Sequence, residues 1–262
     1  MSAILKMYRF PNKIFPNAIN AYLLCPFKFK CHNDPDVKAE FVETPQSFSG
    51  SAIHLALKEF FDITKVPIDK RKVIDIGEIL RDAWGKLAPK DKRKELFGSQ
   101  EQERAFGLQA VSVLKNFLSS VDLSVVPLAL EDWFDCPLSG FTIAGRIDRI
   151  DREDGKISVW DYKTGKLPFH QTIEDIIKED LQIPIYAIIA SKLNPLINEV
   201  RAGLIYLKFS KTYEACWNKE QLKGIEQTVV SAINKAKEDK ALLPKPNKLC
   251  EWCEYKKVCP RS

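Results

Sequence analysis

The sequence contains no apolar segment near the roughly 18 residues that a membrane-spanning helix requires. Its first residues, MSAILKMYRFPNK, lack the apolar core and the cleavage site of a secretory signal peptide. Internal repeats and low-complexity segments are missing as well. From these absences we expect a cytoplasmic protein that makes no contact with a membrane.

Charge and cysteine usage narrow the class further. The net charge of +5 and the pI near 8.7 are mild, so they permit a polyanionic partner without requiring one. The seven cysteines are an odd number in a chain without a secretion signal, which argues against a disulfide framework. A length of 262 residues with 45% hydrophobic residues suits one large or two small globular domains.

Hydrophobic periodicity divides the chain into two parts. Residues up to about 120 follow a helical pattern, and three short alternating segments at 127–137, 141–151 and 157–163 predict strands. A helix is expected near 173–192, a strand at 200–210 and a helix at about 219–239. These elements predict an α/β fold: a mixed central β-sheet flanked by helices, with an N-terminal helical insertion and a C-terminal tail.

The segment DREDGK between the second and third strands predicts a two-residue hairpin at Asp154-Gly155. With that turn, paired residue numbers sum to 309, so Asp148 lies opposite Asp161. Opposed residues have Cβ atoms about 4.5–5.5 Å apart. Lys163 shares the face of Asp161 because side chains alternate along a strand.

Two carboxylates this close repel each other unless a divalent cation such as Mg or Mn lies between them. An exposed, solvated hairpin is the alternative for these charges taken alone. The same register places Arg146 opposite Lys163, which requires an acid or a phosphate between them, and a shift by two residues would keep the same face. A phosphate-binding P-loop is excluded, because Trp160 stands at the first glycine position and Leu167 follows the lysine.

Several motifs in order give these residues a context. GRIDRID, VWDYKTGK and QIPIYA, with an upstream helical GSAIHLAL and the strand LALEDWF, resemble the RecB-like branch of the PD-(D/E)XK nuclease superfamily. The matching positions are His54, Glu131, Asp148, Asp161, Lys163, Gln182 and Tyr186. The resemblance runs from about residue 17 to the end of the chain, and it implies a restriction-endonuclease-like core.

The resemblance also implies roles. Asp148 and Asp161 would bind Mg or Mn together with His54 and the backbone carbonyl of Tyr162, and Glu131 is a further candidate ligand. The catalytic set would be Asp148, Asp161, Lys163, Gln182 and Tyr186. Lys163 would act on the attacking water and the transition state. Gln182 and Tyr186, four residues apart on one helix face, would hold the active site and the DNA strand.

The last thirteen residues carry a C-x₂-C-x₅-C pattern formed by Cys250, Cys253 and Cys259. Three thiolates leave a tetrahedral site incomplete, so a fourth ligand must come from elsewhere. The layout resembles the iron–sulfur nucleases of the same branch, including AddB-type subunits and CRISPR-associated four-cysteine exonucleases. This resemblance implies that Cys25, in the sequence CPF, joins the trio around a [4Fe-4S] cluster.

Some cysteine alternatives stay open. Zinc also accepts four cysteines, and Cys31 competes with Cys25 as the fourth ligand. Cys136 and Cys216 are interpreted as small packed hydrophobic residues. We expect a single nuclease domain over 1–262: a helical region at 1–125, a core at 126–240, and a tail at 241–262 that closes on Cys25.

The function implied is that of a metal-dependent DNA nuclease, a single-strand-preferring exonuclease that works in DNA repair, recombination or CRISPR-type DNA processing. Its partners would be single-stranded DNA and a helicase or CRISPR adaptation protein. Two alternatives are a non-catalytic DNA-binding scaffold on the same fold and an RNA-directed nuclease.

Overall fold

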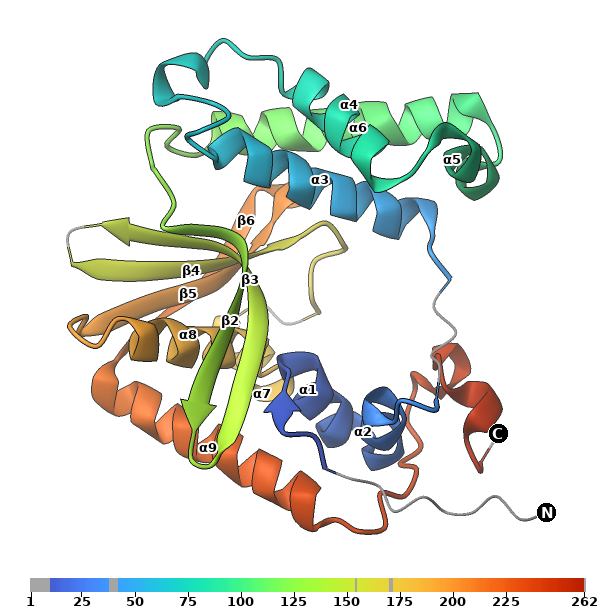
Figure 1. Cartoon of the computed structure of the whole chain (residues 1–262), viewed down its shortest axis with the longest axis vertical. Helices are drawn as coiled ribbons and strands as arrows, with labels where there is room; N and C mark the ends of the chain where they lie inside the picture. The colour runs from blue at the N-terminus through green and yellow to red at the C-terminus, as the bar shows by residue number, and fades with distance from the viewer. Residues whose placement is uncertain (1–9, 38–41, 154, 170–171, 262) are drawn as a thin grey trace.

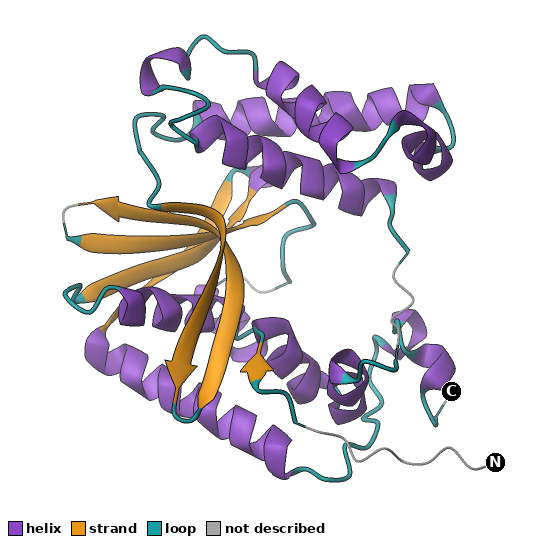
Figure 2. Ribbon diagram, viewed as in Figure 1, coloured by secondary structure: helices purple, strands orange, loops and turns teal. Residues whose placement is uncertain are grey.

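A six-stranded mixed sheet forms the centre of the molecule (Figures 1 and 2). The computed structural model describes residues 10–37, 42–153, 155–169 and 172–261. Strand order is β1-β3-β4-β5-β6, with β2 paired to β3. The β1–β3 and β4–β5 pairs are parallel and the others antiparallel. The strands are β1 Lys13–Ile14, β2 Ala129–Leu138, β3 Phe141–Glu153, β4 Lys156–Lys163, β5 Glu199–Tyr206 and β6 Lys211–Asn218.

Four helices form a layer over one side of the sheet, at the top of Figure 1. They are α3 Pro45–Phe61, α4 Ile76–Leu87, α5 Lys90–Phe97 and α6 Gln100–Ser119. Their apolar faces form one buried cluster that includes Tyr162 of β4 and Leu207, which follows β5. Thr44 begins α3 with a capping box. Because a Cβ on Gly50 would lie 2.8 Å from Thr164 Oγ1, a glycine here lets α3 approach the end of β4 closely.

The opposite side of the sheet carries α7 Ile173–Glu179, α8 Gln182–Leu193 and α9 Lys219–Glu238. With the strands they form the largest buried cluster. Two more helices, α1 Pro16–Leu24 and α2 Pro26–Asn33, lie beside α9 and near the C-terminal tail (Figure 1). None of the helices in the described ranges combines the length and apolar character needed to cross a bilayer.

The predicted α/β class is confirmed, with three local differences. The short strand β1 lies in the part of the chain expected to be helical. The helix expected at 173–192 is interrupted at Asp180 and Leu181, so it forms α7 and α8. The strand expected at 200–210 ends at Tyr206, and a sixth strand, β6, follows it without having been predicted. Only two side chains of β6, Tyr213 and Trp217, are buried. This edge strand therefore has too few apolar positions to give a clear pattern.

One edge of β3 contains a break that positions the functional site. This edge pairs with β1 at residues 142–143 and with β4 at residues 149–153, while β2 occupies the other edge over 141–150. Between those two pairings, residues 144–148 have no neighbouring strand on this edge among the described segments. Polar side chains can therefore satisfy the backbone in this gap, as Tyr186 does by donating a hydrogen bond from Oη to the carbonyl of Arg146 at 2.8 Å.

Candidate active site

The hairpin joining β3 and β4 sets the position of the two aspartates. Arg149 pairs with Trp160 and Ile150 with Val159, so the predicted register is confirmed. Gly155 has the positive φ of 75° expected in the turn, and Asp154 lies outside the described residues.

The ladder ends before the aspartates. Beyond Arg149 and Trp160 the strands separate, and Asp148 accepts a hydrogen bond from the backbone N–H of Tyr162 at 2.7 Å. The carboxylate thus replaces a strand carbonyl as the acceptor for β4. It lies almost fully buried at the point where β3 and β4 diverge.

This divergence also corrects the expected contact between Arg146 and Lys163. Arg146 pairs with Trp133 of β2, and its Nε lies 3.1 Å from Glu131 Oε2. Lys163 instead contacts Asp161 and Gln182. The two cations are separated because β3 turns away from β4 before it reaches Lys163.

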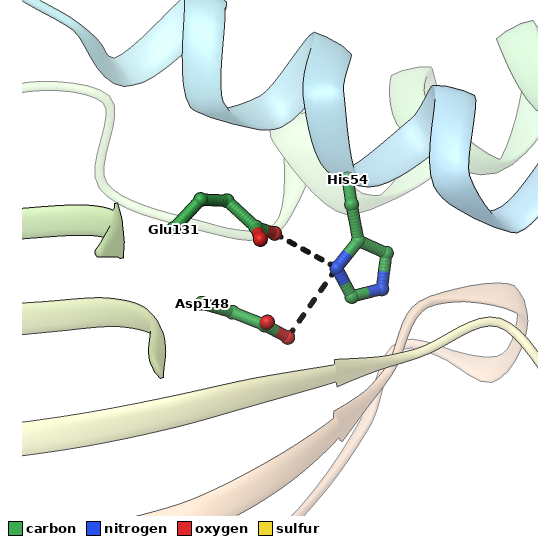
Figure 3. Close-up of side chains that lie close together, drawn as sticks. All are labelled: His54, Glu131 and Asp148. Carbon is green, nitrogen blue, oxygen red and sulfur yellow. Dashed lines mark hydrogen bonds and ion pairs between the residues drawn. The ribbon is translucent and has the colours of Figure 1, made fainter. Parts of the chain in front are cut away.

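Three candidate ligands come together from three elements: His54 from α3, Glu131 from β2 and Asp148 from β3 (Figure 3). His54 Nδ1 lies 3.0 Å from Glu131 Oε1 and 3.4 Å from Asp148 Oδ2. The three ligand atoms are within 4.8 Å of one another, a spacing that one metal ion could bridge. Among the described residues, no such group includes Asp161.

Glu131 reaches this group through an unusual backbone conformation. Its φ of 52° lies in the left-handed region, which costs a non-glycine residue about 1–3 kcal/mol. Its neighbours keep regular pairing, Leu130 with Arg149 and Asp132 with Ile147. The strain is therefore confined to the residue whose carboxylate contacts His54 and Arg146, as expected where a site constrains the chain.

Asp161 belongs to a second set of contacts beside the first. Gln182 Nε2 donates to Asp161 Oδ1 at 2.9 Å and to Tyr186 Oη at 3.1 Å, and its Oε1 accepts from Lys163 Nζ at 2.9 Å. Lys163 Nζ also lies 2.7 Å from Asp161 Oδ2. That short contact pairs the buried Asp161 Oδ2 with the ammonium group of Lys163.

Burial and neighbouring charges shift several pKa values here. Burial disfavours the charged form of His54, but its hydrogen bonds to Asp148 and Glu131 outweigh this and raise its pKa to about 10. Burial raises the pKa of Asp161 to about 6, opposed by Lys163 and reinforced by Asp148. Burial also works against the charge of Lys163, yet Asp161 raises the pKa of that ammonium group. The negative charge of the carboxylates is thus offset by Lys163 beside Asp161, by the proton on His54, and by Arg146 beside Glu131.

The donor set fits a hard divalent cation. Glu131, Asp148 and His54 converge on one space, and Asp161 lies beside them with the buried ammonium group of Lys163. Asp161 Oδ2 is a buried oxygen that lies 2.7 Å from Lys163 Nζ, so an oxygen and an ammonium group stand side by side at this site. Oxygen and imidazole ligands suit Mg and Mn, and a cation would offset both the burial that raises the pKa of Asp161 and the smaller repulsion from Asp148.

His54, Asp148 and Asp161 line a cleft of about 650 Å³, while Glu131 lies behind its lining residues. All the proposed catalytic residues contribute to it, and so do residues that the sequence motifs did not identify: Phe15, Asn20, His32, Trp133, Arg146 and Asp180. Asn20 of α1 donates to Asp180 Oδ1 at 2.6 Å and accepts from the Leu181 N–H at 3.0 Å. These bonds hold the interruption between α7 and α8, so Gln182 begins α8 facing the cleft.

The cysteine-bearing tail lies against the end of α1. Cys25, Cys250, Cys253 and Cys259 line one cavity of about 420 Å³, which does not include Cys31 among its lining residues. The Lys245 N–H donates to Cys25 Sγ and the Asn247 N–H to Cys250 Sγ, each at 3.3 Å.

Three cysteines lie outside this cavity. Cys31 is buried, and burial raises its pKa to about 11. Cys136 is buried as predicted. The interpretation of Cys216 as a packed residue is wrong, because it faces solvent from the edge strand β6.

Comparison with known proteins assigns the chain to a family. A model of the PD-(D/E)XK nuclease superfamily matches residues 15–260. The gene 69 protein of Mycobacterium phage D29 is 28% identical over 141 residues, which are 50% of this chain and 48% of that protein. The alignment therefore spans about half the length of that relative. A solved structure of a candidate exonuclease from Eubacterium rectale has a TM-score of 0.55 and 12% identity, covering 97% of this chain and 93% of that one.

Proposed function

This chain belongs to the PD-(D/E)XK nuclease superfamily, and on that premise we propose that it is a Mg- or Mn-dependent deoxyribonuclease of the RecB-like branch. The specific proposal is an exonuclease that prefers single-stranded DNA and carries a structural [4Fe-4S] cluster. One observation supports it most: six side chains from four separate motifs line a single cleft, namely His54, Asp148, Asp161, Lys163, Gln182 and Tyr186.

The carboxylates and imidazole would hold the catalytic cation. Asp148, Asp161 and His54 would ligate it with the backbone carbonyl of Tyr162, and Glu131 lies close enough to be a further ligand. A bound divalent cation supplies Lewis acidity at the phosphate and lowers the pKa of an attacking water. His54 must lose its proton for its Nδ1 to become a ligand.

Lys163 and its partners would act on the reacting phosphate. The ammonium group lies 2.7 Å from Asp161 Oδ2, so it is held beside the cation position where negative charge develops during hydrolysis. Gln182 fixes this arrangement by binding both Lys163 and Asp161. Tyr186 fixes β3 through the carbonyl of Arg146 and receives a hydrogen bond from Gln182. Both residues are therefore proposed as orienting groups that border the DNA strand.

The cysteine cavity supports an iron–sulfur cluster better than zinc. A tetrahedral zinc ion holds its sulfur ligands about 3.8 Å apart, because each Zn–S bond is about 2.3 Å. Among the described residues, no three cysteine sulfurs lie within 4.8 Å of one another. A [4Fe-4S] cluster takes each thiolate on a different iron and so needs wider spacing. Cys25, Cys250, Cys253 and Cys259 would be the ligands, with two backbone N–H donors to their sulfurs.

The single-strand preference rests on the contact between the chain ends. The tail meets Cys25 at the end of α1, and α1 also lines the cleft through Asn20. Closure of the tail would narrow access and favour one strand over a duplex. This substrate is consistent with a role in DNA repair, recombination or CRISPR-type processing. A helicase or adaptation partner would supply the single strand.

The proposed function is tested by incubating labelled single-stranded DNA, duplex DNA, nicked circles and RNA with the protein and Mg or Mn. We expect progressive cleavage of single-stranded DNA from its ends. Asp161→Asn should lower the rate by roughly 10³-fold, since it removes a ligand of the cation. The matched control is Asp135→Asn, which changes an exposed carboxylate on β2 that pairs with Lys13.

Cleavage that continues unchanged in Asp161→Asn would remove the assigned site. Binding of DNA without cleavage by the wild-type chain would favour the scaffold alternative, and preferential cleavage of RNA would favour the RNA-directed one. Equal digestion of blunt duplexes and nicked circles would contradict the single-strand preference.

A further inference from the structure

One wall of the cleft is formed by Trp133, which lies two residues after Glu131 in the motif LALEDWF but matches no functional position of that motif. Trp133 on β2 is 65% exposed and borders the cleft. Phe15, just before α1, packs against it edge to face with ring centroids 6.0 Å apart. A single exposed aromatic residue is ordinary on a protein surface, so its neighbours in the cleft decide what it can do.

Arg146 is the direct partner of Trp133 in the β2–β3 ladder. Its side chain is 54% exposed, and its Nε lies 3.1 Å from Glu131 Oε2. Within the described part of the chain, its two terminal amino groups have no assigned acceptor. An arginine fixed through one nitrogen, with its other donors toward the cleft, can bind a phosphate group.

The position along the strands places this pair beside the candidate metal ligands. Trp133 lies two residues after Glu131 on β2, and Arg146 lies two residues before Asp148 on β3. Residues two apart share a face of the sheet and are about 7 Å apart along the strand. The aromatic and basic pair therefore stands one step along the cleft from the expected reaction centre.

The wall is held in place by contacts behind it. Tyr186 donates a hydrogen bond to the carbonyl of Arg146 at 2.8 Å. Its ring packs onto β3 at Gly145, where a Cβ would lie 2.6 Å from Tyr186 Cε1. The backbone under Arg146 is thus fixed by the residue that also accepts a hydrogen bond from Gln182. A preorganised platform loses little freedom when it binds a flexible strand.

We propose that Trp133 and Arg146 form a binding subsite for one nucleotide of a single strand, next to the phosphodiester that is cleaved. The indole ring stacks on an unpaired base, and the guanidinium group contacts the adjoining phosphate. This inference rests on the proposed function of the same cleft, and it adds the residue that selects unpaired DNA. A base within a duplex is stacked on both faces, so Trp133 can reach it only at a frayed end or in a single strand. Stacking accepts every base, so the subsite should show little sequence preference.

The test measures binding without cleavage, using the full-length chain with Asp161→Asn and a fluorescein-labelled 12-nucleotide single strand. Trp133→Ala should weaken binding by about 5- to 100-fold, the range typical for the loss of one stacked base. Trp133→Phe should keep affinity within about threefold of the parent. Trp252→Ala is the matched control, because Trp252 is 76% exposed but lies on the tail outside the cleft.

Strands with one abasic position identify the contact directly. The abasic position is moved along the strand one nucleotide at a time. At one position it should lower the affinity of the parent chain, while the affinity of Trp133→Ala should stay the same as for the intact strand. Arg146→Met should reduce the salt dependence of binding by about one phosphate contact. The inference is overturned if Trp133→Ala binds like the parent, if no abasic position is coupled to Trp133, if duplex binding falls equally, or if the parent does not bind single strands.

The subsite and the proposed nuclease function can fail independently. Binding that depends on Trp133 in a chain whose wild-type form cleaves no nucleic acid would keep the subsite and reject the nuclease. Cleavage of single strands that is indifferent to Trp133 would keep the nuclease and reject the subsite.

Discussion

The carboxylate site and the cysteine tail differ in what holds them together. His54, Asp148 and Asp161 extend from a long helix and two central strands, and each is held by side-chain or backbone contacts. The described tail, residues 241–261, has only two three-residue 3₁₀ turns, and its buried hydrophobic side chains are Leu242 and Tyr255. The sheet therefore orders its site during folding, whereas we expect the tail to take much of its order from its ligand.

The two regions are joined by α1. Cys25 directly follows this helix, and Asn20 within it holds the interruption before α8, where Gln182 begins. A change at the cysteines can therefore reach the cleft through one short helix. The difference between the two sites predicts four outcomes, which follow from the largest expected effect to the smallest.

The largest effect is expected from Cys253→Ser. Purified wild-type protein should be brown, with broad absorption near ~400 nm and about four irons per chain. The variant should lose the iron almost completely, and trypsin should then cut the tail while the sheet resists. Cys216→Ser is the matched control because it removes an exposed thiol remote from the tail. Cys31→Ser should also keep its iron. Zinc in the wild-type protein, or iron retained by Cys253→Ser, would contradict the cluster assignment.

The second prediction tests how rigidly the sheet holds its site. Gly145→Ala places a methyl group against the Tyr186 ring, at 2.6 Å from Cε1, so the ring must move and its bonds to Arg146 and Gln182 must weaken. We expect kcat to fall by about 10- to 100-fold, as for other groups that orient ligands, while iron content stays unchanged. Gly224→Ala on α9 adds the same methyl group in open space and should leave activity intact. Full activity in Gly145→Ala would show that the position of Tyr186 is unimportant.

The third prediction concerns protons at the carboxylate site. The pKa of His54 is raised to about 10 and that of Asp161 to about 6, so metal must displace a proton from His54 at pH 8, and from both residues at pH 5. Apparent affinity for Mn should therefore increase at least about tenfold from pH 5.5 to pH 8. Titration calorimetry in buffers of different ionisation enthalpy measures the released protons. Equal affinity at both values would exclude the proposed ligands, and iron content should not follow this profile.

The smallest effect is on stability. The folded-state pKa of Asp161 is raised, so its contribution favours folding at low pH and is lost as the pH rises through about 6. In buffer with a chelator at pH 8, Asp161→Asn should raise the melting temperature by a few degrees, and by less at pH 5. Asp135→Asn should show no such pH dependence. A lower melting temperature for Asp161→Asn at pH 8 would contradict this prediction. It would mean that the ion pair between Lys163 and Asp161 stabilises the fold by more than the burial of the ionised carboxylate costs.

Particular residues show which features of the fold and the site could be predicted from the sequence. The turn at Gly155 and strict alternation predicted the β3–β4 register, because strand geometry has a fixed period. The motifs also identified six of the residues that line the cleft. Asn20 was missed as a cleft residue because its helix has an ordinary local pattern. Trp133 and Arg146 lie inside the motifs LALEDWF and GRIDRID, but the motifs assign a role only to Glu131 and Asp148. Their place depends on the divergence of β3 from β4 and on contacts between distant segments.

The sequence by itself determined the class of fold, the strand register and the candidate ligands, because periodicity, turn chemistry and motif spacing act over short distances. Only the tertiary structure decided that His54, Glu131 and Asp148 share one space, that Asp161 pairs with Lys163 beside them, and that Cys25 meets the tail. Those contacts join residues up to 220 positions apart in the sequence. They arise from how the helices pack on a sheet that opens at residues 144–148, and no local pattern carries that information.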